Sequence, residues 1–367
     1  MQVGVVFGGR SVEHLVSIRS AKTVREGLRQ AGHDVVCLYI DERGSFHDAP
    51  SSSLVIDQQR ALPPAGTKPG RSLHHLVDAD IDAVFPITHG TFGEDGTLQG
   101  LLEMLDLPYV GCATAASAVA MDKLLSKRLF AAADIPVVPY AGVHRAAFEA
   151  GALDDAKAFV DAHADLKGIL PLFVKPAVGG SSVGCRKVKA LGTLKQDVAF
   201  ALSFDETALI ETNVSAREVE IAVLGFDAAS MKASVPGEIV PGADFYDYAD
   251  KYLKDDAKLL APAPVDPATT KKLQDAAIAA MGAIGGAGLA RVDFFLLPGG
   301  GFFLNEINTL PGFTNVSMYP QLWALSGVPL PELCDRLVQL AVERHQRRAH
   351  IDASLQEFVR SAASKAT

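Results

Sequence analysis

The first third of the chain alternates short apolar runs with longer amphipathic stretches. Residues 3–7, 34–40 and 82–88 are apolar runs of strand length. Residues 17–32 and 97–107 instead carry apolar positions at helical spacing,. Such alternation predicts a doubly wound parallel sheet, in which ligands bind at the carboxyl ends of the strands. The loops at those ends are therefore the first places to look for a site.

The rest of the chain predicts antiparallel sheet. A Gly/Ser-rich loop at 179–184 separates two strand-like runs, 170–176 and 185–189, which is typical of a hairpin,. Residues 49–72 are rich in Pro, Ser and Gly and are expected to form an irregular connection. The polar, Ala/Ser-rich tail at 350–367 is expected to fray,. The remaining predicted elements are strands at 207–212, 217–225, 289–297 and 302–308 and helices at 115–133, 267–285 and 329–347.

Composition narrows the class of protein. The 367 residues predict two or three domains, and 49% hydrophobic residues can supply a full core,. A net charge of −9 argues against nucleic acid as the main partner,. No apolar run approaches the roughly 20 residues of a membrane span, and the N-terminus is interpreted as a strand, not a signal peptide. The scattered cysteines suggest neither zinc nor a disulfide framework. We expect a soluble cytoplasmic enzyme.

The densest chemical signal lies in 289–317. Glu306 and Asn308 alternate along one strand and project together, and Asp293 can join them from a neighbouring strand,. Two carboxylates and a carboxamide make an all-oxygen site, which suits Mg²⁺ or Mn²⁺ better than zinc. Arg291 shares the face of Asp293, and its planar fork suits a phosphate or an oxyanion.

A second signal surrounds the Gly/Ser loop. Lys175 ends an apolar strand just before the loop, whose glycines let backbone N–H groups approach a polyphosphate, and Ser181 and Ser182 add hydroxyls,. The P-loop pattern is absent. Lys123, in a helical stretch, is a candidate for a second phosphate-binding lysine. Taken alone, a Gly/Ser loop is more often a plain hairpin tip, and the lysine that precedes it favours a phosphate site.

Three further segments carry polar groups that could serve a site. The glycine-rich loop at 88–100 holds His89 and Glu94 and leads into a helix, whose N-terminus attracts anions,. Glu13 lies near a helix start, where a carboxylate is often only a dipole partner. Residues 244–258 combine four aromatic residues with many charges and could form a closing lid or an ordinary loop.

Together these motifs resemble the D-alanine–D-alanine ligases of the ATP-grasp superfamily, over roughly residues 1–345. The family implies a three-domain fold that combines α/β and α+β parts. It implies an N-terminal domain with the first-substrate site at 1–113, a central ATP-grasp subdomain at 114–214, a C-terminal ATP-grasp subdomain at 215–349 and a polar tail at 350–367. The motifs are VVFGGRSVEHLVS, HGTFGEDGTLQG, MDK, VKPAVGGSSVG, FYDYADKY, ARVDFF and NEINTLPGFTNVSMYP.

The resemblance also implies a reaction. ATP would phosphorylate the carboxylate of one D-alanine, and the amine of a second would attack the acyl phosphate. The products would be D-alanyl-D-alanine, ADP and phosphate, for peptidoglycan precursor synthesis. It implies Mg²⁺ or Mn²⁺, with two ions, allows for a monovalent cation, and implies a cytoplasmic homodimer whose small-molecule partners are D-alanine and ATP.

The resemblance assigns roles to individual residues. Glu13 would take the first ammonium with His89 nearby, and Tyr252 would link Ser181 to Glu13 as the lid closes. Arg291 and the N–H of Gly312 would hold the oxyanion. The second substrate would meet Ser317 and Met318, and the metal ligands would be Asp293, Glu306 and Asn308. The ATP-binding residues would be Lys123, Lys175, Ser181, Ser182, Val183, Glu211, Thr212, Val214, Glu218, Phe245, Asn305 and Glu306.

Two other interpretations stay open at this point. A related ligase could use D-serine, D-lactate or another amino acid as second substrate, and departures from the family pattern at Leu15 and Thr212 leave room for such a specialised relative. An inactive nucleotide-binding ATP-grasp module would be expected to lose a metal ligand, Arg291 or a lysine, and all of these are present.

Overall fold

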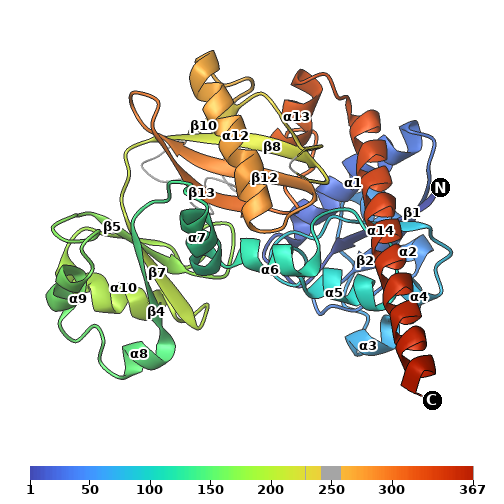
Figure 1. Ribbon diagram of the computed structural model, residues 1–367, viewed down its shortest axis with the longest axis horizontal. Coiled ribbons are helices and arrows are strands. Elements are labelled where there is room, and N and C mark those ends of the chain that lie inside the picture. The colour runs from blue at the N-terminus through green and yellow to red at the C-terminus, as the bar shows by residue number, and fades with distance from the viewer. Residues whose placement is uncertain (228, 241–257, 367) are drawn as a thin grey trace.

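Three β-sheets organise the chain in the computed structural model (Figure 1), which describes residues 1–227, 229–240 and 258–366. Phe245 and Tyr252 therefore lie outside the described residues. No helix in the described part of the chain combines the length and apolar character that crossing a membrane requires.

The first sheet is parallel, as predicted, with strand order β2-β1-β3. Within β1, Val5 and Phe7 pack in a core with helices α1 and α14 (Leu330–Ala366), whereas Val6, between them, packs on the opposite face with α4 and α5. Alternate side chains of a strand point to opposite faces, so this run is apolar throughout because both faces are covered. The elements are β1 (Gln2–Gly8), β2 (Asp34–Ile40), β3 (Ala83–Pro86), α1 (His14–Gln30), α4 (His74–Val77) and α5 (Thr97–Met104).

The prediction that 49–72 is irregular is wrong in part. The segment begins with α2 (Ala49–Gln58) and ends with α3 (Pro69–Ser72). Asp48 caps α2 by accepting a hydrogen bond from the Ser51 N–H, and Pro50 lies in the first turn, where its missing N–H costs nothing,. Proline and serine therefore start a helix here.

The second sheet is antiparallel and includes the predicted hairpin. Leu172 pairs with Val188 across the two strands that flank the Gly/Ser loop, which confirms the hairpin. The strand order is β4-β7-β5-β6, and α10 packs on the sheet. The elements are β4 (Tyr140–His144), α8 (Arg145–Glu149), α9 (Ala156–Ala162), β5 (Leu172–Pro176), β6 (Arg186–Val188), α10 (Leu194–Ala201) and β7 (Thr207–Thr212).

The third sheet is also antiparallel, in the order β11-β10-β8-β12-β13, with β9 beside β8. Helix α12 crosses one face of it (Figure 1) and buries Leu273, Ala277 and Met281 against β8 and β12. On the opposite face, Ala222 and Leu224 pack with the helix at Met318–Leu325, and the rest of that face carries polar side chains such as Glu220 and Asp293. The elements are β8 (Arg217–Gly225), β9 (Lys232–Ala233), β10 (Gly237–Val240), β11 (Lys258–Leu260), α12 (Pro267–Ala283), β12 (Gly288–Leu296) and β13 (Phe302–Asn308).

The predicted helix at 115–133 is two helices, α6 (Thr114–Met121) and α7 (Lys123–Ala132). Asp122 separates them because its backbone is extended and forms an isolated bridge to Val178. Its side chain accepts hydrogen bonds from the Leu124 and Leu125 N–H groups and so caps α7,. The break places Lys123 at the first position of the second helix.

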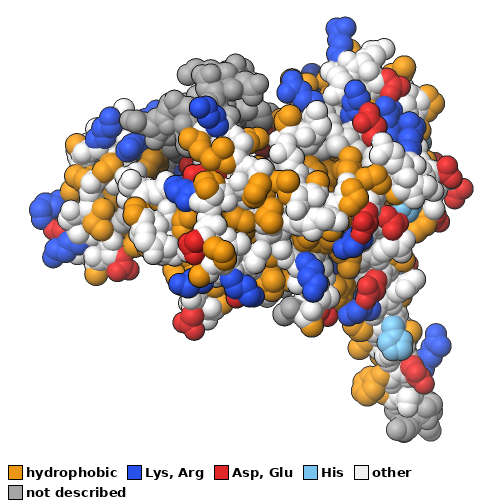
Figure 2. Space-filling view, turned by 90° about the horizontal axis from the view of Figure 1, so that it is seen from above, with side chains coloured by type: hydrophobic (Ala, Val, Ile, Leu, Met, Phe, Trp, Pro, Cys, Tyr) orange, Lys and Arg blue, Asp and Glu red, His pale blue; other side chains and the backbone are white. Residues whose placement is uncertain are grey.

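The last two helices are α13 (Met318–Leu325) and α14 (Leu330–Ala366). The expectation that 350–367 frays is wrong, because α14 continues through this segment, although its residues 350–363 are exposed. Figure 2 shows this end of the helix projecting from the body. Nearer its start, Cys334 packs against Gly27 of α1, where an added Cβ would lie 2.7 Å from the sulfur.

Removal of residues 350–367 should leave the fold intact, because the described side chains removed are exposed. We expect the free energy of unfolding to change by less than about 0.5 kcal/mol. Leu337→Ala, in the buried part of the same helix, should cost about 2–5 kcal/mol,. Denaturant unfolding of both proteins checks this, and a truncation as costly as Leu337→Ala would contradict it.

Candidate active site

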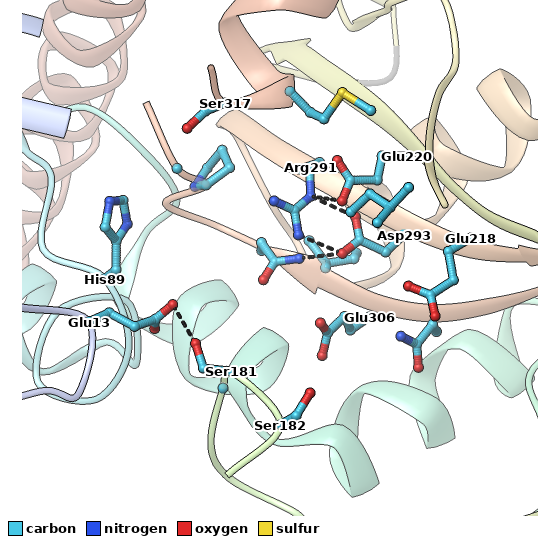
Figure 3. A pocket seen from close by; sticks show the side chains of 18 of the residues that line it. Glu13, His89, Ser181, Ser182, Glu218, Glu220, Arg291, Asp293, Glu306 and Ser317 are labelled. Atoms are coloured by element: carbon cyan, nitrogen blue, oxygen red, sulfur yellow. Dashed lines mark hydrogen bonds and ion pairs between the residues drawn. The ribbon is translucent and has the colours of Figure 1, made fainter. Parts of the chain in front are cut away.

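One cavity, of ≈ 1330 Å³ (Figure 3), is lined by strands of the second and third sheets and, from the N-terminal part, by α1 and by the loop that holds His89 and Glu94. Every site residue predicted from the sequence and described by the structure lines it, including Glu13 from the N-terminal part and Ser317 near the C-terminal end. Phe245 and Tyr252 stay predictions. Residues as far apart as Glu13 and Ser317 thus share one cavity.

A charged cluster covers the open face of β12 and β13. Strand pairing sets Asp293 opposite Glu306 and Arg291 opposite Asn308. Arg291 donates to both oxygens of Asp293, from Nε at 2.8 Å and from Nη2 at 2.7 Å. The Asn308 amide donates to the same carboxylate at 2.9 Å. The predicted sharing of a face by these residues is confirmed (Figure 3).

Glu220 of β8 completes this cluster and was not foreseen in the sequence. Its Oε1 lies 3.2 Å from Arg291 Nε. Burial alone would lower the pKa of Arg291, but Asp293 and Glu220 raise it well above the usual value. Arg291 is thus a permanent, fixed cation in the cavity. The alternation of Glu218 and Glu220 along β8 was the available signal, since both face the cavity,.

The oxygen atoms of Asp293, Glu306 and Asn308 could hold a divalent cation. Asp293 Oδ2 accepts hydrogen bonds from both Arg291 Nη2 and Asn308, which use its two lone pairs, and Oδ1 accepts from Arg291 Nε,. A metal would therefore bind Asp293 through Oδ1 or displace one of these donors. Among the described residues, no three His, Cys, Asp or Glu side chains form a metal centre. An ion here would thus complete its shell with water and substrate phosphates, as Mg²⁺ does.

The buried carboxylate of Glu211 forms an ion pair with Lys175, the lysine predicted to bind phosphate. Glu211 lies 2.6 Å from Lys175 Nζ and 2.7 Å from Lys127 Nζ. Burial would raise the pKa of Glu211, but the two ammonium groups lower it to about 2. Burial would likewise lower the pKa of Lys175, and Glu211 raises it instead. Sequence reasoning missed Lys127, although it lies four residues after Lys123 and so on the same side of α7.

The Lys123 side chain links α7 to the Gly/Ser loop and to β13. Its ammonium donates to the Gly179 carbonyl at 2.6 Å and lies 3.2 Å from Glu306 Oε2. The helix break at Asp122 is what aims this side chain, because the first residue of α7 faces the Gly/Ser loop. A cation is therefore held between the loop and the candidate metal ligand Glu306.

A hydrogen bond links the Gly/Ser loop to the N-terminal part. Ser181 donates from Oγ to Glu13 Oε1 at 2.8 Å (Figure 3). Glu13 makes no side-chain cap bond to α1, so it is more than a dipole partner. Ser181 and Ser182 have φ of 54° and 58°, a strained left-handed backbone of the kind that gathers at functional sites,.

The loop at 309–317 is fixed from the N-terminal side. Glu94 accepts from the Gly90 N–H at 2.9 Å and from the Leu310 N–H at 3.3 Å. Burial and the neighbouring Glu13 carboxylate raise the pKa of Glu94 to about 8, against the effect of these two N–H groups. Ser317 ends the loop and accepts from the Thr314 N–H.

The arrangement of these groups is typical of one class of enzyme. Two antiparallel sheets enclose a cavity with a glycine-rich loop, paired lysines and an oxygen-rich acidic cluster, which is the layout of ATP-grasp ligases. Models of the D-ala D-ala ligase N-terminus and C-terminus match residues 2–112 and 129–339. The chain belongs to the D-alanine–D-alanine ligase family.

Individual relatives agree over nearly the whole chain. D-alanine–D-alanine ligase A of Escherichia coli (strain K12) is 42% identical over 361 residues, which cover 94% of this chain and 96% of the relative. The D-alanine–D-alanine ligase from Coxiella burnetii superposes with a TM-score of 0.81 at 36% identity, covering 98% of this chain and 99% of that one. The VanG D-Ala:D-Ser ligase from Enterococcus faecalis gives 0.78 at 32% identity, covering 93% and 99%.

Glu94 should make stability depend on pH. A carboxyl group whose pKa is raised in the folded state, here from 4.5 to about 8, stabilises the fold fully only at low pH,. The wild type should therefore lose stability relative to Glu94→Gln as the pH rises from about 5 to 8. Thermal melting of both proteins across that range checks this. A difference in melting temperature that stays constant with pH would contradict it.

Proposed function

We propose that this ligase joins two D-alanines at this cavity, with ATP as the energy source, to supply a peptidoglycan precursor. The observation that carries the proposal is the Ser181–Glu13 hydrogen bond. It sets a carboxylate suited to an amino-acid ammonium against a loop suited to a polyphosphate. A ligase that activates an amino acid must bring these two substrates together.

In the first step the carboxylate of one D-alanine attacks the γ-phosphorus of ATP, and ADP leaves. Lys123 and Lys175 would hold the phosphates, and Glu13 would hold the ammonium of the amino acid. When bound at Asp293, Glu306 and Asn308, Mg²⁺ or Mn²⁺ would neutralise charge on the phosphates. The adenine would lie along 211–214 and the ribose beside Glu218. The remaining proposed ATP contacts are Ser182, Val183, Phe245 and Asn305.

In the second step the amine of another D-alanine attacks the carbonyl carbon of the acyl phosphate, and phosphate leaves. Negative charge builds on the carbonyl oxygen. Arg291, a fixed cation, and the Gly312 N–H would stabilise it,. Ser317 would bind the carboxylate of the second substrate, with Met318 beside it. Because an acyl phosphate hydrolyses, we propose that Tyr252 closes the cavity over Ser181 and excludes water.

Membership of the family also supports proposals about the cellular location and the oligomeric state of the protein. We place the enzyme in the cytoplasm, where ATP is available, and propose that it is a homodimer. We also keep the proposed division into 1–113, 114–214, 215–349 and the tail, since each of the first three ranges holds one sheet. Sedimentation of the full chain tests the dimer independently of the chemistry.

The decisive experiment is ATP-dependent condensation with D-alanine alone and with D-serine or D-lactate as competing second substrates. We expect D-alanyl-D-alanine as the main product and phosphate release that depends on D-alanine. Mass spectrometry separates the dipeptide, the mixed dipeptide and the ester. A predominant mixed product would assign a different second substrate, and no D-alanine-dependent phosphate release would overturn the proposal.

Loss of a proposed metal ligand should affect turnover far more than folding. Asp293→Asn and Glu306→Gln should each lower kcat by about a hundredfold or more, since charge on the transferring phosphoryl group is no longer neutralised. Asp275→Asn, an exposed change on α12, is the matched control and should be neutral,. Near-normal kcat in both ligand variants at saturating Mg²⁺ would contradict the metal assignment.

A further inference from the structure

His89 has no ring nitrogen left for a substrate. The side chain is buried, its Nδ1 lies 2.9 Å from the Leu310 carbonyl oxygen, and its Nε2 lies 2.9 Å from Ser20 Oγ. The family resemblance implied that His89 would stand near the first ammonium. Its hydrogen bonds lead instead to the loop at 309–313.

The direction of these bonds fixes the state of the ring. A carbonyl oxygen only accepts, so Nδ1 must carry the proton. Ser20 Oγ accepts from the Phe313 N–H at 3.2 Å and can donate its own proton to Nε2,. Burial lowers the pKa of His89 and so favours the neutral ring, which with these partners is the Nδ1–H tautomer.

These bonds form one continuous chain that starts and ends on the same loop. It runs from the Phe313 N–H through Ser20 and His89 to the Leu310 carbonyl. Between its two ends lie only Pro311 and Gly312. The N–H of Gly312 is the group proposed to hold the oxyanion. These hydrogen bonds therefore fix the backbone on both sides of this donor.

Other contacts hold the ends of the loop but not its middle. The Leu310 N–H donates to Glu94, and the Phe313 ring packs against Phe85 and Tyr319 with centroid distances of 5.8 and 5.6 Å. Ser20 and His89 are the groups that tie the backbone of Phe313 to that of Leu310. Without them, the Pro311–Gly312 peptide would be held by the Glu94 bond at Leu310, by the Thr314–Ser317 bond beyond Phe313 and by side-chain packing, with no hydrogen-bonded link between Leu310 and Phe313.

We propose that His89, acting through Ser20, is a positioning residue that orients the Gly312 N–H toward the developing oxyanion and does not bind substrate. This inference rests on the proposed ligase function. Misplacing a group by about 1 Å can cost a hundredfold in rate, and losing one oxyanion donor costs about 10²–10³ in kcat. Partial misorientation should therefore lower kcat by about 10- to 100-fold, without weakening the binding of either substrate to the same degree.

The test compares two serines on successive turns of α1. Ser20→Ala breaks the link to Phe313. Ser17→Ala removes an equally buried hydroxyl whose bonds go to Gly8 and Ile87, away from the loop. Ser20→Ala should lower kcat about 10- to 100-fold with the KM values for ATP and D-alanine within about twofold of wild type. Ser17→Ala should retain wild-type kcat.

Two further measurements separate positioning from a general loss of structure. Binding of a phosphinate dipeptide, whose tetrahedral phosphorus mimics the intermediate, should weaken in Ser20→Ala by the same factor as kcat, while ADP binding stays unchanged. His89→Asn places an amide nitrogen where Nδ1 was and should keep the Leu310 bond alone. It should match Ser20→Ala, and the double variant should be no worse than either single variant.

The outcomes separate this inference from the proposed function. If the wild type forms no dipeptide, the proposed function fails before any variant is compared. If the wild type is active and Ser20→Ala behaves like Ser17→Ala, the positioning role is wrong. A His89→Asn variant that raises the KM for D-alanine at unchanged kcat would make His89 a substrate ligand and would also overturn it. If Ser20→Ala does not fold, the kcat, the KM values and the phosphinate binding of His89→Asn test the positioning role instead.

Discussion

The antiparallel pairing of β12 with β13 is the constraint on which the site depends. It sets Asp293 opposite Glu306 and Arg291 opposite Asn308, so that two acids, an amide and a guanidinium share one face. A slip of β13 by one residue would turn Glu306 and Asn308 to the other face, where α12 packs,. The buried Ile307 opposes such a slip, because its burial under that helix would be lost.

Charge balance then decides which groups can be buried in the cavity. Lys127 and Lys175 share one buried acid, Glu211, and Arg291 is held by Asp293 and Glu220. An isolated buried charge would be costly, whereas here the opposite charges raise the pKa of Lys175 and Arg291 and lower that of Glu211,. The cavity therefore presents fixed cations at rest, with little rearrangement left for the reaction. At Lys127 burial outweighs Glu211 and lowers the pKa, and at Glu94 burial and the nearby Glu13 carboxylate raise it.

Much of the fold could be predicted from periodicity, because its strands have sharp patterns. The parallel first sheet, the hairpin around the Gly/Ser loop and the strands at 217–225 and 302–308 were all found. The failures have local causes. Asp122 splits a helix because a capping side chain and a backbone bridge outweigh helical propensity. The segment at 49–72 forms two helices because proline is favourable in a first turn,.

The sequence by itself determined which side chains are candidates for the chemistry, since acids, lysines and glycines at fixed spacing are visible without coordinates. It also predicted that Arg291 and Asp293 share a face, because side chains alternate along a strand. Only the tertiary structure decided that Glu13 meets Ser181, that Lys127 pairs with Glu211, and that His89 turns to Leu310 and Ser20. These contacts join distant or separately packed elements, and local pattern does not encode the packing that brings such elements together.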